Sequence, residues 1–483
     1  MTSITLHGAA GEIGGNKILL EDKDTKIFLD FGLSFGKWGN YFTPYLQPRK
    51  WSYINDFIKL GLLPDLEGLY RADYENRYRT SKPDPEYDGI ILSHPHLDHA
   101  GHISFVRADI PVHCSMGGKA ILEVLEETGT GFNEYTQLKE AFKLRPYTKD
   151  PTKMTRDNDS VTERKMNIFT NKTKINNLTV HSFPVDHSIC GANSFVIETS
   201  AGNIVYTGDI RFHGRRSNYS HFFVEKATEF EPVLMISEGT RVSERNSFGE
   251  LELERDLKSL MSDVKGLVIV NFPVRDTDRM RSFIEAAKTV GRKLVINMKQ
   301  AYTLSVLERN GVSEVPRSDE VEIYIPKKGW GVLNNDDYPR NVQLRDYLKW
   351  EEEMLNKSNA VTAEEIRENP RDYVFRCDFF ELKYLFDVQP PEGSIYIRSV
   401  TEPIDEEMEI EKEKADNWLN KFNLLPYKQI HCSGHASGAE IQDMIQKIAP
   451  KRVIPIHTEK PAEFRSFDAE IILKGLGEKY LLS

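Results

Sequence analysis

The first half of the chain is a series of short apolar runs, each of which ends in a glycine or in polar residues. The runs are found at residues 4–8, 17–21, 26–30, 87–93, 178–183 and 203–208. Their length and their spacing by turn residues predict β-strands, the first three of which form a meander. Polar residues that directly follow these runs are therefore expected at the ends of strands.

In the second half, apolar runs alternate with segments of helical periodicity. Strands are predicted at 233–237, 266–271, 293–297 and 452–456. Apolar residues between the second and third of these recur on one helical face, at Met280, Phe283, Ile284 and Ala287. This β-α-β order predicts a parallel sheet with right-handed crossovers.

Three segments interrupt this pattern. Residues 34–86 are rich in Tyr, Trp and Pro and are expected to form a packed flap. Residues 144–176 are polar and predict an exposed excursion. Residues 301–390 are charged and irregular, so their helices can be placed only loosely.

A cluster of histidines follows the run at 87–93. His94, His96, Asp98 and His99 fall within six residues. Imidazole and carboxylate groups are the ligands that suit zinc and similar divalent ions. His94 and His96 lie two residues apart, so an extended loop can direct both at one ion, which leaves Asp98 and His99 for a second. The alternative is a histidine-rich surface loop that binds nothing.

Three further candidates also stand at strand ends. His187 follows the run at 178–183, and Asp209 follows the run at 203–208. Asp30 closes the third run of the meander, where a carboxylate can orient a ligand histidine. In isolation, each would be interpreted as a structural residue or a turn residue. Their order after the histidine cluster favours a metal centre in which Asp209 bridges two ions.

Composition limits the class of protein. The chain has 483 residues, a hydrophobic content of 39% and a net charge of -11, so we expect a globular protein of at least two domains without a general basic surface. The four cysteines are far apart and form no CxxC pair, which favours a reducing compartment. No signal peptide or membrane helix is predicted. We therefore expect a cytoplasmic protein that does not bind a membrane.

These motifs resemble those of the metallo-β-lactamase superfamily. Residues 8–16 look like the start of ribonuclease J proteins, and Glu238, His435 and His457 resemble three motifs of the β-CASP nucleases within that superfamily. The resemblance implies an α/β fold, with a metallo-β-lactamase αββα sandwich and an inserted β-CASP α/β domain. The expected parts are residues 1–237 and 427–483 for the sandwich and 238–426 for the insertion. The C-terminal domain of many ribonuclease J proteins is expected to be lacking.

The resemblance also implies a role for each motif residue. The first metal would be held by His94, His96, His187 and Asp209, and the second by Asp98, His99, His457 and Asp209. Zinc is the expected metal, with manganese as the alternative, and Asp98 is also expected to act in catalysis. His435 would assist the leaving oxygen, Glu238 would orient His435, and Asp30 would support a ligand. The substrate phosphate is expected to bind at Ser433, Gly434, His435, Ala436 and Ser437. Arg211, Arg215, Arg216 and Arg241 could contact the nucleic-acid backbone or could equally form ion pairs.

The resemblance implies a metal-dependent nuclease that hydrolyses RNA by a two-metal hydroxide mechanism. It implies 5′→3′ exonuclease activity and leaves additional endonuclease activity open. Single-stranded DNA is a second candidate substrate. A hydrolase of a lactone, thioester or β-lactam is the alternative function, and an inactive scaffold subunit is a third. Thr458 and Pro95 replace glycines that are common in the family, which leaves ligands unchanged but alters the loops. The sequence leaves open whether the protein is a monomer or a homodimer.

Overall fold

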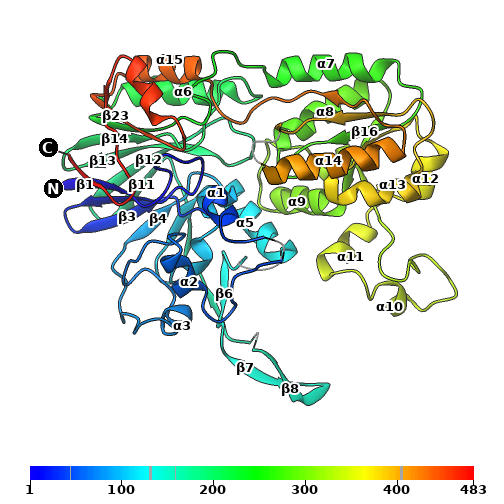
Figure 1. The fold of residues 1–483 in the computed structure, drawn as a ribbon, viewed down its shortest axis with the longest axis horizontal. Helices are drawn as coiled ribbons and strands as arrows, with labels where there is room; N and C mark the ends of the chain where they lie inside the picture. Colours follow the sequence, from blue (N-terminus) through cyan, green and yellow to red (C-terminus); the bar gives the residue numbers. More distant parts are fainter. Residues whose placement is uncertain (44, 130–132, 158, 403–405, 483) are drawn as a thin grey trace.

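Two seven-stranded sheets lie face to face, and a third seven-stranded sheet lies beside them (Figure 1). This arrangement is seen in a computed structural model, which describes residues 1–43, 45–129, 133–157, 159–402 and 406–482. None of the helices in these ranges combines the length and the apolar character that a membrane-spanning helix needs.

The first sheet contains the predicted N-terminal meander. In spatial order its strands are β10 (Met166–Ile168), β5 (Val112–Cys114), β4 (Gly89–Ile91), β3 (Thr25–Leu29), β2 (Ile18–Asp22), β1 (Thr2–Leu6) and β25 (Lys479–Leu482). Strands β1 and β25 are antiparallel neighbours, so the two ends of the chain meet in this sheet.

The second sheet covers the inner face of the first. Its strands are β11 (Lys172–Ile175), β12 (Leu178–Pro184), β13 (Asn193–Thr199), β14 (Gly202–Tyr206), β15 (Leu234–Glu238), β23 (Arg452–Ile456) and β24 (Glu470–Ile471). Buried side chains from both sheets, among them Leu20, Ile91 and Ile197, form one shared core. Helices α6 (Ser217–Thr228) and α15 (Gly438–Ile448) pack on the outer face of the second sheet, and α5 (Met116–Thr128) packs outside the first. The result is the predicted αββα sandwich.

The third sheet is wholly parallel, as the alternation of strands and helices predicted. Its strands are β19 (Ala360–Val361), β18 (Glu322–Tyr324), β17 (Lys293–Asn297), β20 (Tyr373–Arg376), β16 (Val268–Asn271), β21 (Ile395–Arg398) and β22 (Lys428–Gln429). Its longer helices are α7 (Glu250–Ser262), α8 (Thr277–Thr289), α9 (Met298–Arg309) and α14 (Glu406–Lys421). The shorter ones are α10 (Arg340–Gln343), α11 (Lys349–Leu355), α12 (Ala363–Glu368) and α13 (Leu385–Val388).

The sheets divide the chain slightly differently from the predicted domain boundaries. Glu238 is the last residue of β15 and so belongs to the second sheet, and β22 extends the third sheet beyond residue 426. Backbone hydrogen bonding continues past each predicted boundary, because the apolar runs do not mark where a strand ladder ends. We therefore propose that the inserted domain runs from the loop after Glu238 to Gln429.

The irregular segments are also structured. In residues 34–86, helix α2 (Tyr53–Lys59) carries the fully buried Phe57, whose ring packs against Trp38 of α1 (Phe35–Gly39), and α3 (Ala72–Glu75) lies beside α2, so this flap is packed, as expected. The expected excursion at 144–176 begins as an exposed hairpin of β7 (Leu144–Tyr147) and β8 (Asp150–Arg156), which projects from the body (Figure 1). Its base is the antiparallel pair β6 (Gln137–Lys139) and β9 (Val161–Glu163).

The remaining elements are short. They are α4 (Leu97–Ala100) and the 3₁₀ turns Ile103–Phe105, Ser318–Glu320, Phe379–Tyr384 and Pro461–Ser466.

Two buried arginines join the sandwich to the inserted domain. Arg211 pairs with Asp186 at 2.9 Å in the sandwich and with Asp278 at 2.9 Å in α8. Arg279 of α8 pairs with Glu250 and donates to the carbonyl of Cys432 at 2.8 Å. A buried charge is tolerated only when it is well paired, so these contacts fix the two halves relative to each other.

Lys17 is buried with no ion pair among the described residues and is expected to destabilise the fold. Burial lowers the pKa of Lys17 to about 7, with a further contribution from Lys37 that Glu12 opposes. The unfolded chain keeps the ordinary value near 10.5, so the cost of burial is full below pH 7 and disappears as the pH rises to 10.5. We expect Lys17→Met to raise the midpoint of thermal unfolding by a few degrees at pH 7 and less at pH 9. An unchanged or lower midpoint at pH 7 would mean that Lys17 has a partner that stabilises it.

Candidate metal centre

The predicted site residues lie at one edge of the sandwich, where strands of both sheets end. Asp30 follows β3, His94 follows β4, His187 follows β12, Asp209 follows β14, and His457 follows β23. These strands run in the same direction within each sheet, so their carboxyl ends reach the same edge. Asp98 and His99 lie in α4, directly after the loop that carries His94 and His96.

One group of four ligand atoms comes from His94, His96, His187 and Asp209. Nδ1 of His96 lies 3.1 Å from Nε2 of His94 and 3.1 Å from Nε2 of His187. The carboxylate oxygen Oδ2 of Asp209 lies 3.5 Å from Nε2 of His94 and 3.7 Å from Nε2 of His187. The four atoms therefore surround one point.

A second group comes from Asp98, His99, His457 and the same Asp209. Nε2 of His99 lies 3.2 Å from Oδ2 of Asp209, and Nε2 of His457 lies 3.2 Å from Oδ2 of Asp98. The remaining separations from His457 to Asp209 and from His99 to Asp98 are 3.8 Å and 3.9 Å. All seven predicted ligands are thus brought together, with Asp209 common to both groups.

Both groups fit a divalent ion. With metal–ligand bonds of about 2.0–2.1 Å, two atoms on a tetrahedral zinc ion lie roughly 3.4 Å apart, close to the separations found here. Oδ1 of Asp209 is buried and has no hydrogen-bond partner in the described part of the chain, which a ligand bond would satisfy. Burial also lowers the pKa of His94 and His187 far below the usual value and that of His96 to about 4, so these imidazoles are neutral and able to bind a metal.

Access to the site is from one side. The side chains of Asp98 and His435 are 20% and 21% exposed, and His96 is partly exposed, whereas the other ligands are buried. A substrate would therefore approach past these three side chains.

Asp30 lies behind His99, on the side of the imidazole that faces away from Asp209. Oδ2 of Asp30 accepts from Nδ1 of His99 at 2.7 Å and from the Ser93 hydroxyl at 2.7 Å, and the Tyr206 hydroxyl also donates to it. Since Nδ1 of His99 is the donor, its Nε2 faces Asp209. Burial lowers the pKa of His99, but the carboxylates of Asp209, Asp30 and Asp98 outweigh burial and raise it well above the usual value. Tyr206 was not anticipated, because β14 gives only an apolar strand pattern.

Two glycines allow the ligand loops to approach their neighbours. Gly208 has a φ of +53°, and a Cβ there would lie 2.7 Å from Cβ of Ser93. A Cβ on Gly32 would lie 1.6 Å from the carbonyl oxygen of Asp98. A side chain at either position would displace a ligand loop, so these glycines are required by the geometry of the centre.

His435 and Glu238 form a pair beside the centre. Nδ1 of His435 lies 3.0 Å from Oε2 of the buried Glu238 and 3.8 Å from Oδ2 of Asp209. Burial lowers the pKa of His435, but the charges of Glu238 and Asp209 outweigh burial and raise it to about 9. An imidazole with this pKa is protonated at neutral pH and can give a proton to a leaving oxygen. The Thr240 hydroxyl, which sequence reasoning missed, lies 2.8 Å from Nδ1 of His457 and 3.2 Å from Nδ1 of His435.

The loop at 433–437 differs from the predicted phosphate site. The amide of Ala436 donates to Ile210 at 2.8 Å, and Ser437 caps α15 through Glu440. Both residues are buried, so their donors are already used inside the protein and cannot receive a phosphate. The phosphate-binding role of Ala436 and Ser437 stays a prediction that this geometry does not favour, because small residues before a helix also suit an ordinary capping box. Ser433, Gly434 and His435 remain partly exposed.

The four arginines suggested as backbone contacts are engaged in ion pairs. Arg211 is buried between the halves, Arg216 pairs with Asp278 at 3.1 Å, and Arg241 pairs with Glu244 at 2.6 Å. Arg215 pairs with Glu254. Their alternative interpretation as ion-pair partners is the one that the structure favours.

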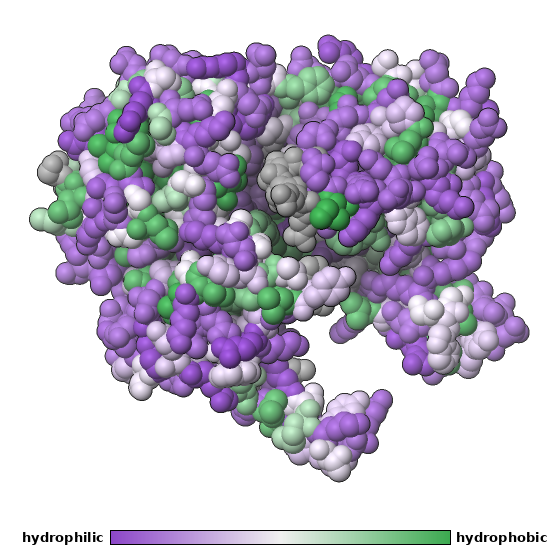
Figure 2. All heavy atoms as spheres, viewed as in Figure 1, coloured by the Kyte–Doolittle hydropathy of each residue, from purple (hydrophilic) through white to green (hydrophobic). Residues whose placement is uncertain are grey.

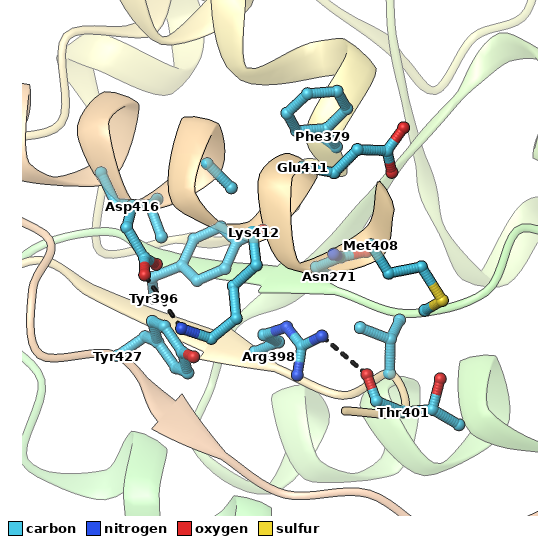
Figure 3. A pocket seen from close by; sticks show the side chains of 13 residues that line it. Asn271, Phe379, Tyr396, Arg398, Thr401, Met408, Glu411, Lys412, Asp416 and Tyr427 are labelled. Carbon is cyan, nitrogen blue, oxygen red and sulfur yellow. Dashed lines mark hydrogen bonds and ion pairs between the residues drawn. The ribbon is translucent and has the colours of Figure 1, made fainter. Parts of the chain in front are cut away.

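A separate cavity of about 170 Å³ lies in the inserted domain, under α14 and beside the ends of β16 and β21 (Figure 3). Tyr396, Tyr427 and Phe379 contribute aromatic side chains to its lining. Its cations are already engaged, since Arg398 donates to the carbonyl of Thr401 and Lys412 pairs with Asp416 at 3.0 Å (Figure 3). None of the seven candidate ligands is among its described lining residues, so it is distinct from the centre.

Comparison with known proteins agrees with this geometry. Residues 427–472 match the family described as RMMBL, a Zn-dependent metallo-hydrolase RNA specificity domain. The chain is 24% identical to Ribonuclease J of Mycoplasma genitalium over 95% of its own length and 68% of the relative. It is 22% identical to Ribonuclease J 2 of Staphylococcus aureus (strain MRSA252) over 94% of its length and 68% of that relative. A crystal structure of a protein of unknown function from Enterococcus faecalis V583 matches with a TM-score of 0.73 and 25% identity, over 100% of both chains.

Proposed function

From the premise that the chain is a ribonuclease J-like, metal-dependent hydrolase with the metallo-β-lactamase and β-CASP architecture, we propose that it cleaves phosphodiester bonds of RNA. The observation that carries the proposal is the pair of ligand groups that share Asp209. We propose one divalent ion in each group, with zinc as the first candidate. When bound, two such ions lower the pKa of a water molecule and neutralise charge on the phosphate.

The protein's own residues would then position and protonate the substrate. Asp209 and the six other ligands fix the geometry of the centre, and the protonated His435 stands ready to supply a proton to the leaving 3′-oxygen. Glu238 holds Nδ1 of His435, which directs Nε2 away from Glu238. A small substrate such as a lactone or a β-lactam needs neither this pair nor an inserted domain, which favours a nucleic acid.

The four cysteines are free and buried, which supports a reducing compartment such as the cytoplasm. We propose this location together with the RNA substrate.

Directionality is the finer part of the proposal. We expect release of nucleotides from the 5′ end, and faster degradation of 5′-monophosphorylated RNA than of the 5′-triphosphorylated form. With Ala436 and Ser437 already engaged, the terminal phosphate would have to bind at Ser433, Gly434 and His435, and the extra charge of a triphosphate would be poorly accommodated there. The measurement is product analysis of the two RNAs labelled at either end, with zinc or manganese supplied. Equal rates, or release from the 3′ end, would contradict a 5′ exonuclease.

The same preparation separates the broader alternatives. Single-stranded DNA and a chromogenic β-lactam are tested beside the RNA under identical conditions. Hydrolysis of the β-lactam without RNA cleavage would support the small-substrate hydrolase, and no turnover of any substrate by metal-loaded protein would support the scaffold.

A further inference from the structure

Arg275 is a cation that makes no ion pair with any residue in the described ranges. Its Nη1 atom is buried, and no hydrogen bond or ion pair to its guanidinium is found among the described residues. The neighbouring Arg279 differs sharply, because it is held by Glu250, Ser399 and Cys432. A guanidinium nitrogen that is buried without a partner costs free energy, so an unpaired one beside a reaction centre calls for an anion that is not part of the protein.

A second unpaired cation lies next to it. Arg275 belongs to the loop after β16, and Lys299 lies in the first turn of α9 after β17. The side chain of Gln300 donates to the carbonyl of Val274 at 3.3 Å, which ties the start of α9 to this loop. Burial lowers the pKa of Lys299, and the charge of Arg275 lowers it further. The two cations repel each other, and neither has a carboxylate within ion-pair distance in the described ranges.

Both cations come from the edge of the inserted domain that faces the sandwich. Helix α9 lies beside α5 of the sandwich (Figure 1), and the Tyr302 hydroxyl of α9 donates to Glu127 of α5. The charge of Arg275 reaches the metal centre, because it lowers the pKa of His96 and interacts with the carboxylate of Asp98. Asp98 is a proposed metal ligand. A bound metal would neutralise the carboxylate of Asp98, so this carboxylate would no longer offset the charge of Arg275.

Arg275 and Lys299 are both partly exposed. Figure 2 shows a hollow between the half that contains the sandwich and the half that contains the inserted domain. In parallel α/β sheets, ligands bind outside the carboxyl ends of the strands, where Arg275 and Lys299 stand. Arginine and lysine are the side chains that bind phosphate, arginine through its planar fork and lysine as a point charge.

We propose that Arg275 and Lys299 form a subsite that binds a phosphate group of the RNA next to the phosphate that is cleaved. The inference rests on the proposed function. It also explains how a chain with a net charge of -11 can hold a polyanion, since the positive charge would be concentrated where the strand must lie.

The test compares Arg275→Gln and Lys299→Gln with Arg255→Gln, which removes the same charge from an exposed position on α7. Two substrates are used, a short 5′-phosphorylated oligoribonucleotide and a dinucleoside monophosphate that has only one phosphate. We expect Arg275→Gln to lower kcat/KM on the oligonucleotide by about 10- to 100-fold and to change the dinucleoside rate far less. The slope of log kcat/KM against log salt concentration should fall by about 0.7, the value for one phosphate contact on a single strand.

Several outcomes would overturn the subsite. Arg275→Gln could behave like Arg255→Gln, could slow both substrates equally, or could lose metal, and each result would assign Arg275 a different role. If Arg275→Gln does not fold, Lys299→Gln gives an independent test. If the wild type does not cleave the dinucleoside, the salt dependence of kcat/KM on the oligonucleotide tests the subsite instead. If the wild-type, metal-loaded protein fails to cleave RNA at all, the proposed function is wrong, and that failure is distinct from failure of the subsite.

Discussion

The Asp209→Asn variant is expected to lose bound metal and to cleave RNA about 10⁴-fold more slowly than the wild type, or not at all. Oδ2 of Asp209 lies 3.2–3.8 Å from nitrogen atoms of His94, His99, His187 and His457, so it is the only ligand atom common to both groups. An amide keeps the shape of the carboxylate but removes the negative charge that offsets two dications. Because the substitution is nearly isosteric, the far-ultraviolet circular dichroism should stay that of the wild type.

Elemental analysis measures the metal directly. The wild type, after metal supplementation, should contain two ions per chain, and Asp209→Asn should contain fewer. His181→Ala is a matched control, because His181 lies on β12, pairs with Glu198 and is remote from the centre. A wild-type content of one ion or none in well-folded protein would contradict the two-metal proposal, even if activity were found.

The second large effect is expected at His435. His435→Ala should lower turnover by about 10²–10⁴-fold while the metal content stays that of the wild type, because a general acid contributes to the rate and not to metal binding. His457→Ala should instead lower occupancy of the second group, since its Nε2 is one of the four atoms there. Asp209, Glu238, His435 and His457 also lie close enough to hold an ion together, so metal content is the measurement that separates the two roles.

The pH dependence provides an independent check on the same residue. The pKa of His435 is raised to about 9, and an acid must be protonated to act, so activity should fall as the pH rises through this value. Glu238→Gln removes the principal charge that raises the pKa, and the alkaline limb of kcat/KM should therefore move to lower pH, toward the ordinary histidine value of about 6.5. An alkaline limb that does not move would show that another group is titrating.

The sequence could place several of the candidate ligands at one edge of the sandwich, because these residues follow strands whose apolar runs are easily recognised. His94, His187 and Asp209 occupy equivalent positions after β4, β12 and β14, and the fold brings equivalent positions together. Asp30 was anticipated for the same reason. The local pattern therefore predicts which residue follows each strand, and the common edge of the two sheets brings these residues together.

What the sequence could not predict depends on packing between distant segments. The Ala436 amide donates a hydrogen bond to the Ile210 carbonyl, and the Thr240 hydroxyl contacts His457. Both contacts form only when strands that are far apart in the sequence meet. Arg275 shows no local signal beyond its place after β16, because the absence of a partner is a property of the folded surroundings. Likewise, nothing in the sequence around Arg211 indicates that this residue is buried.

The order in which the chain is synthesised has a consequence for the cell. Strand β1 pairs with β25, and strand β23 of the second sheet, which is followed by His457, lies more than two hundred residues after its neighbour β15. A chain still on the ribosome that has not yet released residues 452–457 lacks that strand and one of the proposed ligands. Metal binding at the second group is therefore expected only after residues 452–457 have left the ribosome, so an earlier nascent chain would lack the complete centre.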